Sequence, residues 1–102
     1  MRNPLLKGLR PVHPGETLRE DVIPAVGRSK TEIARLLGIS RQTLYDIINE
    51  KQPVTPGMAL RLAKMFGGGA ESWLNMQRAY DLHLAEVELA EELKAIPELK
   101  AA

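Results

Sequence analysis

The segment from Lys30 to Asn49 constrains the fold of this chain more than any other, because two short helix signals in it are separated by only Gly38 and Ile39. Gly38 can adopt the left-handed backbone conformation that such a tight connection demands. Ala34 is small where the two helices would approach most closely, and Ile39 can fill the corner between them. The pattern predicts two helices that cross steeply through a very short turn, which is the layout of a helix-turn-helix.

The second of these helices, predicted from Ser40 to Asn49, has one apolar face and one polar face. Its apolar residues recur at helical spacing and are Leu44, Ile47 and Ile48. The polar face can enter a DNA major groove about 12 Å wide, where the first residues of the helix meet base edges. Arg41 suits bidentate pairing with guanine, and Gln42 suits pairing with adenine. The expected base-reading residues are Arg41, Gln42, Thr43, Tyr45 and Asp46.

Residues around the two helices suit phosphate contacts, which position a protein on DNA without reading its sequence. The expected phosphate-binding residues are Lys30, Thr31, Ser40, Lys51 and Gln52. Two other interpretations stay open: an amphipathic hairpin whose polar face is only solvated, and an RNA-binding helical module. RNA-binding modules stack single-stranded bases on exposed aromatic rings. We expect no such rings on the basic face, and this argues against the RNA module.

Proline and glycine residues divide the chain before this motif. A helix is predicted from Pro14, which suits the first helical position, to the breakers Pro24 and Gly27. Ser29 and Glu32 have capping-box spacing, so the first helix of the motif is expected to begin directly after Ser29.

The chain after the motif is also predicted to be helical. One helix begins at Thr55 and ends at a run of three glycines, and the sequence from Ala70 onward forms either one long helix or two helices with a bend near Asp81. Residues 1–12 have no helical period and are interpreted as an arm, with a possible short extended stretch in residues 5–12. The apolar side chains available for burial in the C-terminal region are Trp73, Leu74, Tyr80, Leu84, Val87 and Leu93.

The composition of the chain, with 102 residues of which 44% are hydrophobic, fits one globular domain. There is no cysteine, no apolar run of the ~20 residues that span a membrane and no signal-peptide core, so we expect a cytoplasmic protein without a membrane partner. Residues 1–69 carry 11 Lys/Arg against 6 Asp/Glu, a balance of +5, whereas residues 70–102 carry 3 against 7, a balance of −4. This asymmetry indicates a nucleic-acid-binding surface joined to a different contact surface.

No arrangement of residues indicates catalysis. His13 and His83 are the only histidines in the sequence, and neither has a second metal ligand or a nucleophile at a suitable spacing. The glycine run lacks the lysine and hydroxyl residue of a phosphate-binding loop. We therefore expect a binding protein that is not an enzyme and that uses no metal and no cofactor.

Four motifs together resemble one family. They are His13-Pro14-Gly15-Glu16-x-Leu18, Ile33-Ala34-x-x-Leu37-Gly38-Ile39-Ser40, Thr55-Pro56-x-x-Ala59-x-Arg61-Leu62 and Trp73-Leu74-x-x-Gln77-x-x-Tyr80-Asp81-Leu82. Across residues 13–82 they look like the motifs of HigA-type antitoxins, which belong to the repressor-like helix-turn-helix class that includes lambdoid phage repressors. The chain departs from the family pattern in its glycine run and in the tail beyond Asp81.

The resemblance implies an all-α fold, with a five-helix repressor-like DNA-binding domain, a helix-turn-helix and a helical C-terminal extension. The expected parts are an N-terminal arm (1–12), the DNA-binding domain (13–82) and a helical tail (83–102). The resemblance also implies a homodimer that binds a palindromic double-stranded operator, represses its own operon and neutralises a HigB-type toxin, a ribonuclease that cleaves mRNA. The alternative is a dimeric transcriptional regulator with no toxin partner. A short neighbouring gene that encodes a basic, ribonuclease-like protein would favour the antitoxin. The acidic segment 70–102 would suit such a partner.

Overall fold

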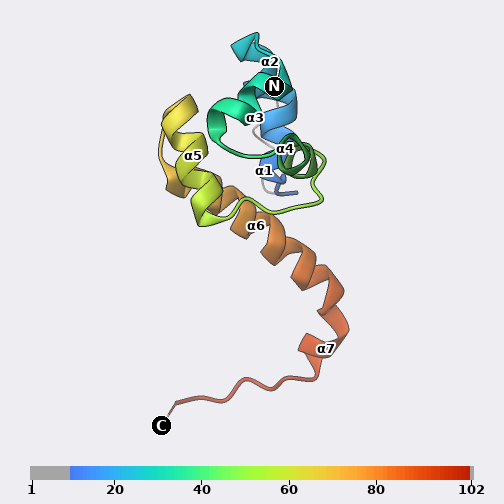
Figure 1. The fold of residues 1–102 in the computed structure, drawn as a ribbon. Helices are drawn as coiled ribbons and strands as arrows, with labels where there is room; N and C mark the ends of the chain where they lie inside the picture. The colour runs from blue at the N-terminus through green and yellow to red at the C-terminus, as the bar shows by residue number, and fades with distance from the viewer. Residues whose placement is uncertain (1–9, 102) are drawn as a thin grey trace.

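The computed structural model describes residues 10–101 as a series of helices joined by short connections (Figure 1). The elements are α1 (Pro14–Thr17), η2 (Leu18–Val22), α2 (Ile23–Val26), α3 (Lys30–Leu37), α4 (Arg41–Ile48), α5 (Pro56–Phe66), α6 (Ala70–Glu88) and α7 (Ala90–Lys94). No strand occurs within residues 10–101, so the predicted all-α class is confirmed. Residues 1–9 of the predicted arm, and with them most of the possible extended stretch, lie outside the described residues.

The first helix is built from α1, η2 and α2, which follow one another without a break. The prediction that Pro24 helps to end this helix is wrong, because the helix continues past it to Gly27, whose φ is 72°. Proline is usually excluded from a helix interior because it has no N–H and its ring meets the carbonyl group four residues earlier. Here the preceding segment η2 is π-helical, with the N–H of Ile23 bonded to the carbonyl oxygen of Leu18, five residues back. The wider turn accommodates the proline ring.

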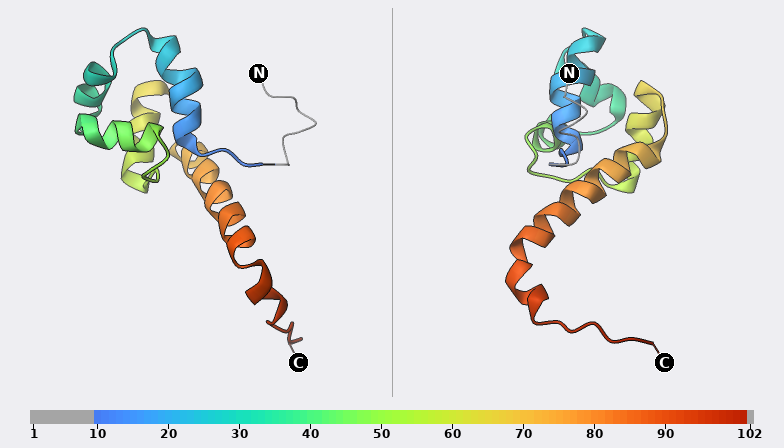
Figure 2. Two further views of the ribbon diagram at one scale, coloured as in Figure 1. Left: turned by 90° about the vertical axis from the view of Figure 1, so that its right-hand side faces the viewer. Right: turned by 180° about the vertical axis from the view of Figure 1, so that it is seen from behind.

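The hydrophobic core lies where α3, α4 and α5 pack against the first helix and the start of α6 (Figure 2). Both helices of the predicted helix-turn-helix bury their apolar faces in this core, as expected from their periodicity. These core residues are Ile33, Ala34, Leu37, Leu44, Ile47 and Ile48. In α5 one apolar stripe faces this core, buried at Ala59 and Leu62 and half-buried at Ala63 and Phe66. The core therefore fixes which face of α4 points outward.

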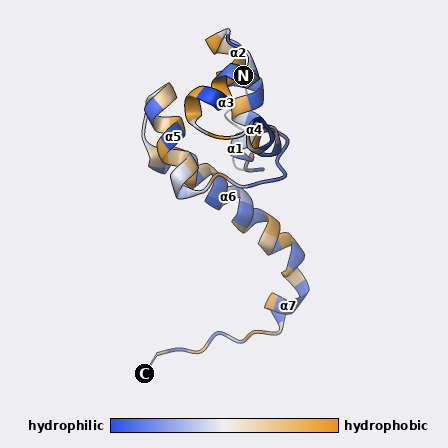
Figure 3. Cartoon of the chain, in the orientation of Figure 1, coloured by the Kyte–Doolittle hydropathy of each residue, from blue (hydrophilic) through white to orange (hydrophobic). Residues whose placement is uncertain are grey.

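Helix α6 leaves the body of the molecule and carries its second half into solvent (Figure 2). The longest dimension of the chain is 55 Å, and its radius of gyration is 16.7 Å, compared with about 13 Å for a compact domain of this length. Burial on α6 ends at Gln77, so Leu84, Val87 and Leu93, which the sequence made available for burial, are exposed. Figure 3 shows hydrophobic and hydrophilic residues alternating along this projecting part.

The sequence left open one long helix or two helices with a bend near Asp81, and the structure has two helices that meet at another position. Helix α6 continues through Asp81 to Glu88, and the helical path is interrupted at Leu89, before α7 begins. There is no proline or glycine between Ala70 and Ile96 to break the helix earlier. Within residues 10–101, no helix combines the length and the apolar character needed to cross a membrane.

Candidate nucleic-acid interface

The turn between α3 and α4 has the geometry that the sequence predicts. Gly38 has a φ of 76°, in the left-handed region that favours glycine. The N–H of Ile39 donates to the carbonyl of Ala34 and the N–H of Gly38 to that of Arg35, each at 3.1 Å. This pair of bonds is a Schellman motif, which satisfies the last carbonyl groups of α3 and turns the chain sharply into α4.

Arg61 of α5 stabilises this turn by a hydrogen bond to its backbone. Its Nη1 donates a hydrogen bond of 2.6 Å to the carbonyl oxygen of Leu37, the last residue of α3. A Cβ atom on Gly38 would lie only 2.8 Å from the same Nη1. Glycine is therefore favoured here by its backbone conformation, and a Cβ would also push the guanidinium of Arg61 away from this bond. The sequence placed Arg61 in a family motif without indicating this contact.

The N-terminus of α4 is capped by Ser40. Its Oγ accepts from the N–H of Thr43 at 3.0 Å and donates to Oγ1 of Thr43 at 2.8 Å. The hydroxyl group of Ser40, which is expected to bind phosphate, is thus hydrogen-bonded to that of Thr43, which is expected to read bases. A serine in this place is worth about 1 kcal/mol of stability relative to alanine.

The exposed face of α4 begins with Arg41 and Gln42, as predicted. Tyr45 is 37% exposed on the same helix, as a base-reading residue must be, so the expected lack of exposed aromatic residues, which argued against an RNA module, does not hold for this face. Asp46 is half-buried, and its Oδ1 accepts a hydrogen bond of 2.8 Å from Nε2 of Gln42. Together with half-buried Thr43, the five predicted base-reading residues therefore lie along one helix whose opposite face is in the core.

The C-terminus of α4 repeats the turn geometry of α3 without a glycine. Glu50 has a φ of 63°, and it donates its N–H to the carbonyl of Ile47 at 3.0 Å, while Lys51 donates to that of Asp46 at 2.8 Å. Arg19 of η2 lies against this end of the helix, where Nη1 donates to the carbonyl of Ile48 and lies 3.4 Å from Oε2 of Glu50. The carboxylate of Glu20 is its third partner, and the bond to Glu20 is the main reason that the pKa of Arg19 is raised.

Gly15 allows the first helix to pack directly on the backbone of α4. A Cβ atom at this position would lie 1.9 Å from the carbonyl oxygen of Ile47, which is far closer than atoms can approach. No other residue type can be placed here without moving α1 away from α4. The sequence identified this glycine only as part of the opening motif, because its function depends on a residue 32 positions later in the chain.

Gln77 of α6 holds the loop that follows α4. Its Oε1 accepts from the N–H of Val54 at 2.8 Å, and its Nε2 donates to Oδ1 of Asp81 at 2.9 Å. Gln77 is 6% exposed, and both ends of its amide are bonded. The buried amide therefore satisfies a backbone N–H of the loop that would otherwise lack a partner in the core.

The opening motif and the C-terminal signature meet at His13 and Tyr80. Their rings are 5.0 Å apart between centroids and inclined at 80°, an edge-to-face contact. Nδ1 of His13 accepts from the N–H of Gly15 at 2.8 Å, so the imidazole caps the first helix. Burial lowers the pKa of His13, while the carboxylates of Glu50 and Asp81 oppose this shift. His13 thus caps the start of the first helix through an Nδ1 that accepts a hydrogen bond and carries no proton.

The predicted phosphate-binding residues flank α4 at several places. Lys30 is half-buried at the first position of α3, while Thr31 is exposed next to it. Lys51 is exposed in the turn that follows α4, whereas Gln52 is half-buried and lines a cavity of about 210 Å³ beside His13. Within residues 10–101, no group of three or more potential ligands could hold a metal ion.

In this structure the surrounding helices contact both ends of α4 and leave its polar face exposed. This arrangement is characteristic of the helix-turn-helix class of DNA-binding proteins. The family model described as helix-turn-helix matches residues 18–74, more than half of the chain. The chain belongs to this family.

Three similar proteins place the chain more closely. It is 47% identical over 75 residues to virulence-associated protein I of Dichelobacter nodosus, covering 74% of this chain and 69% of that protein. It is also similar to the solved Pseudomonas aeruginosa antitoxin HigA with the higBA promoter (33% identity, TM-score 0.83, covering 90% and 100% of the two chains). Antitoxin GraA in complex with its operator is similar at 37% identity and a TM-score of 0.83, covering 100% and 99%. The HigA-like character expected from the motifs is thereby confirmed.

Proposed function

We propose that this chain is a sequence-specific DNA-binding antitoxin that represses its own operon as a dimer and neutralises a HigB-type ribonuclease that cleaves mRNA. The observation that carries the proposal is α4, whose exposed start offers Arg41 and Gln42 while contacts from α1, η2 and α5 hold its two ends. The two structures described with a promoter or an operator support a DNA target. The function is binding, and no reaction is assigned to the chain itself.

In this proposal α4 lies in the major groove. Arg41 pairs with guanine and Gln42 with adenine, each through two hydrogen bonds, and the supporting residues are Thr43, Tyr45 and Asp46. Contacts to the phosphate backbone orient the protein and come from Lys30, Thr31, Ser40, Lys51 and Gln52. Because all residues of the first group lie on one short helix, they would read only a few consecutive base pairs.

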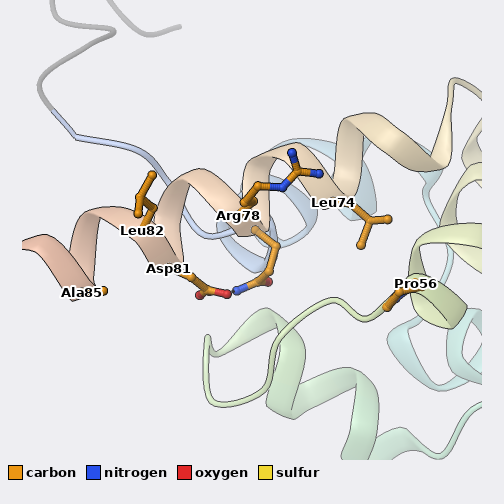
Figure 4. A pocket seen from close by; sticks show the side chains of 7 residues that line it. Pro56, Leu74, Arg78, Asp81, Leu82 and Ala85 are labelled. Atoms are coloured by element: carbon orange, nitrogen blue, oxygen red, sulfur yellow. Dashed lines mark hydrogen bonds between the residues drawn. The ribbon is translucent and has the colours of Figure 1, made fainter. Parts of the chain in front are cut away.

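A reader of so few base pairs needs a second copy to select one site in a genome. The groove beside α6 suits a copy of the same chain, because it has a volume of about 610 Å³ and continues onto the projecting helix. Figure 4 shows the lining residues following one another along α6 away from Pro56, in the order Leu74, Arg78, Asp81, Leu82 and Ala85. Leu82 is 58% exposed on a helix that projects from its own core. A two-fold dimer through this face would read a palindrome with half-sites about 34 to 36 Å apart.

The toxin-binding part of the proposal rests on the HigA-like character and on charge. Residues 70–102 have a balance of −4, and Glu86, Glu88, Glu91 and Glu92 are all exposed on α6 and α7. Opposite charge accelerates the encounter with a basic ribonuclease more than it strengthens the final complex. Since α4 belongs to the basic part of the chain, DNA binding and toxin binding would use different surfaces.

Binding of the purified protein to its own upstream DNA tests the first half of the proposal. We expect at least about a thousandfold preference over random DNA of the same length at fixed salt. Equal affinity for the two DNAs would exclude sequence-specific repression.

The second half is tested with the product of the neighbouring reading frame. We expect equimolar protein to stop its cleavage of RNA, and we expect Arg41→Ala to lose repression while still protecting cells that express this neighbour. If no ribonuclease-like neighbour exists, or if cleavage continues unchanged, the chain is a dimeric transcriptional regulator without a toxin partner.

A further inference from the structure

Gln42 and Asp46 are coupled on the exposed face of α4. They are four residues apart and so lie on the same side of the helix. Nε2 of Gln42 donates to Oδ1 of Asp46 at 2.8 Å. Asp46 is half-buried and its own carbonyl accepts the N–H of Lys51, so its backbone is held at the end of the helix. This contact fixes the Gln42 amide before any DNA arrives.

The chemistry of the pair decides which way the amide points. An ionised carboxylate only accepts hydrogen bonds, so the nitrogen of the Gln42 amide must face Asp46. One of the two amide hydrogens is used in this bond. The other hydrogen and the oxygen Oε1 stay available, and the amide therefore offers one donor and one acceptor to a partner.

We infer that Asp46 is a positioning residue that makes Gln42 accept adenine and reject guanine. The inference rests on the proposed function. Adenine presents an acceptor, N7, beside a donor, the N6 amino group, whereas guanine presents two acceptors, N7 and O6. The fixed amide matches adenine. To bind guanine, Gln42 would have to donate both amide hydrogens to N7 and O6, but one of these hydrogens is already donated to Asp46.

Asp46 could also act on a base itself, by accepting from the N4 amino group of cytosine. The two roles differ in what a substitution removes. Direct reading by Asp46 would appear as a cytosine preference at a base pair of its own. Positioning by Asp46 appears only at the base pair that Gln42 reads, as a changed ratio of adenine to guanine.

The experiment measures base preference position by position in the full-length protein. Selection from a randomised duplex library defines the preferred site of the wild type, and Gln42→Ala identifies the base pair that Gln42 reads. Dissociation constants are then measured for duplexes with adenine or guanine at that position. Asp46→Asn keeps the shape but can donate as well as accept, so both amide orientations become possible. Asp46→Ala removes the acceptor altogether.

We expect the wild type to prefer adenine by roughly 5-fold to 150-fold, and both Asp46 variants to reduce this ratio at least about fivefold. Preferences at the other positions should stay unchanged. Asp21→Asn is the matched control, because it removes one exposed negative charge from η2 and should alter affinity for all duplexes equally. Melting temperatures of all variants show that the comparison concerns folded proteins.

Three outcomes overturn the inference, and they differ in what else they exclude. If the wild type has no sequence preference, the proposed function fails as well. If Gln42→Ala abolishes an adenine preference but the ratio in Asp46→Asn equals that of the wild type, DNA reading stands and positioning by Asp46 is wrong. If Asp46→Asn loses a cytosine preference at another base pair, Asp46 reads that base directly.

Discussion

The close approach of the first helix to α4 predicts that Gly15→Ala destabilises the protein by about 1 to 3 kcal/mol, the usual cost of forcing a methyl group into a packed site. The new Cβ would lie 1.9 Å from the carbonyl oxygen of Ile47, so the two helices must separate by more than 1 Å to reach even 3.0 Å. Ile47 is 1% exposed, and such a movement opens the core around it. Alanine's better helix propensity offsets at most about 1 kcal/mol of this loss.

Gly57 provides a matched control. It occupies the same position in α5 as Gly15 does in α1, directly after the first-position proline, but a Cβ there meets nothing within 4 Å. Gly57→Ala should therefore raise the free energy of unfolding by about 0.4 to 1 kcal/mol, because alanine restricts the unfolded chain. Urea unfolding followed by circular dichroism measures both midpoints, with unchanged slopes expected. If both substitutions move the midpoint upward by similar amounts, the reasoning from close approach is refuted.

Further predictions concern the turn, the DNA face, the first helix and the dimer. Arg61→Leu should lose about 1 to 2 kcal/mol of stability with its bond to Leu37, and an unchanged urea midpoint would contradict that role. Arg41→Ala should lose about 1 to 3 kcal/mol on the preferred DNA site only, whereas Lys51→Ala should weaken binding to all DNA and reduce the salt slope by roughly one; titrations at several salt concentrations distinguish the two. Burial lowers the pKa of His13 in the folded protein, so on acidification the unfolded chain takes up the proton before the folded protein does. The free energy of unfolding that is present above about pH 6.5 should therefore decrease as the pH falls through the folded pKa. His13→Asn, which keeps a capping side chain, should show a smaller decrease between pH 7.5 and 5, and equal slopes would refute the assignment. Leu82→Asp should shift a dimer toward monomer in sedimentation at tens of micromolar, and an unaltered sedimentation coefficient would move the interface elsewhere.

The sequence determined the parts of this protein that depend on neighbours along the chain. Caps at Ser29, Ser40 and Thr55 begin α3, α4 and α5 as their side chains predict, because each hydroxyl bonds an N–H three residues later. The left-handed turn at Gly38 and the outward polar face of α4 follow in the same way from a backbone preference and a helical period.

Helix boundaries became unpredictable where the local signal was overridden. Pro24 lies inside a helix because the π-helical segment before it widens the turn. The interruption of the C-terminal helix falls at Leu89 and not near Asp81, in a part of the chain that no core residue holds in place.

Only the tertiary structure decided what holds α4 in position. Gly15, Arg19, Arg61 and Gln77 each act on the backbone of a segment more than 20 residues away, and three of them do so through a single hydrogen bond to a carbonyl or an N–H group. Every residue has those backbone groups, so they leave no pattern in the sequence that could name the partner. The helix proposed to read DNA could be predicted from its own residues, whereas the contacts that hold it depend on the distances that the packed core sets.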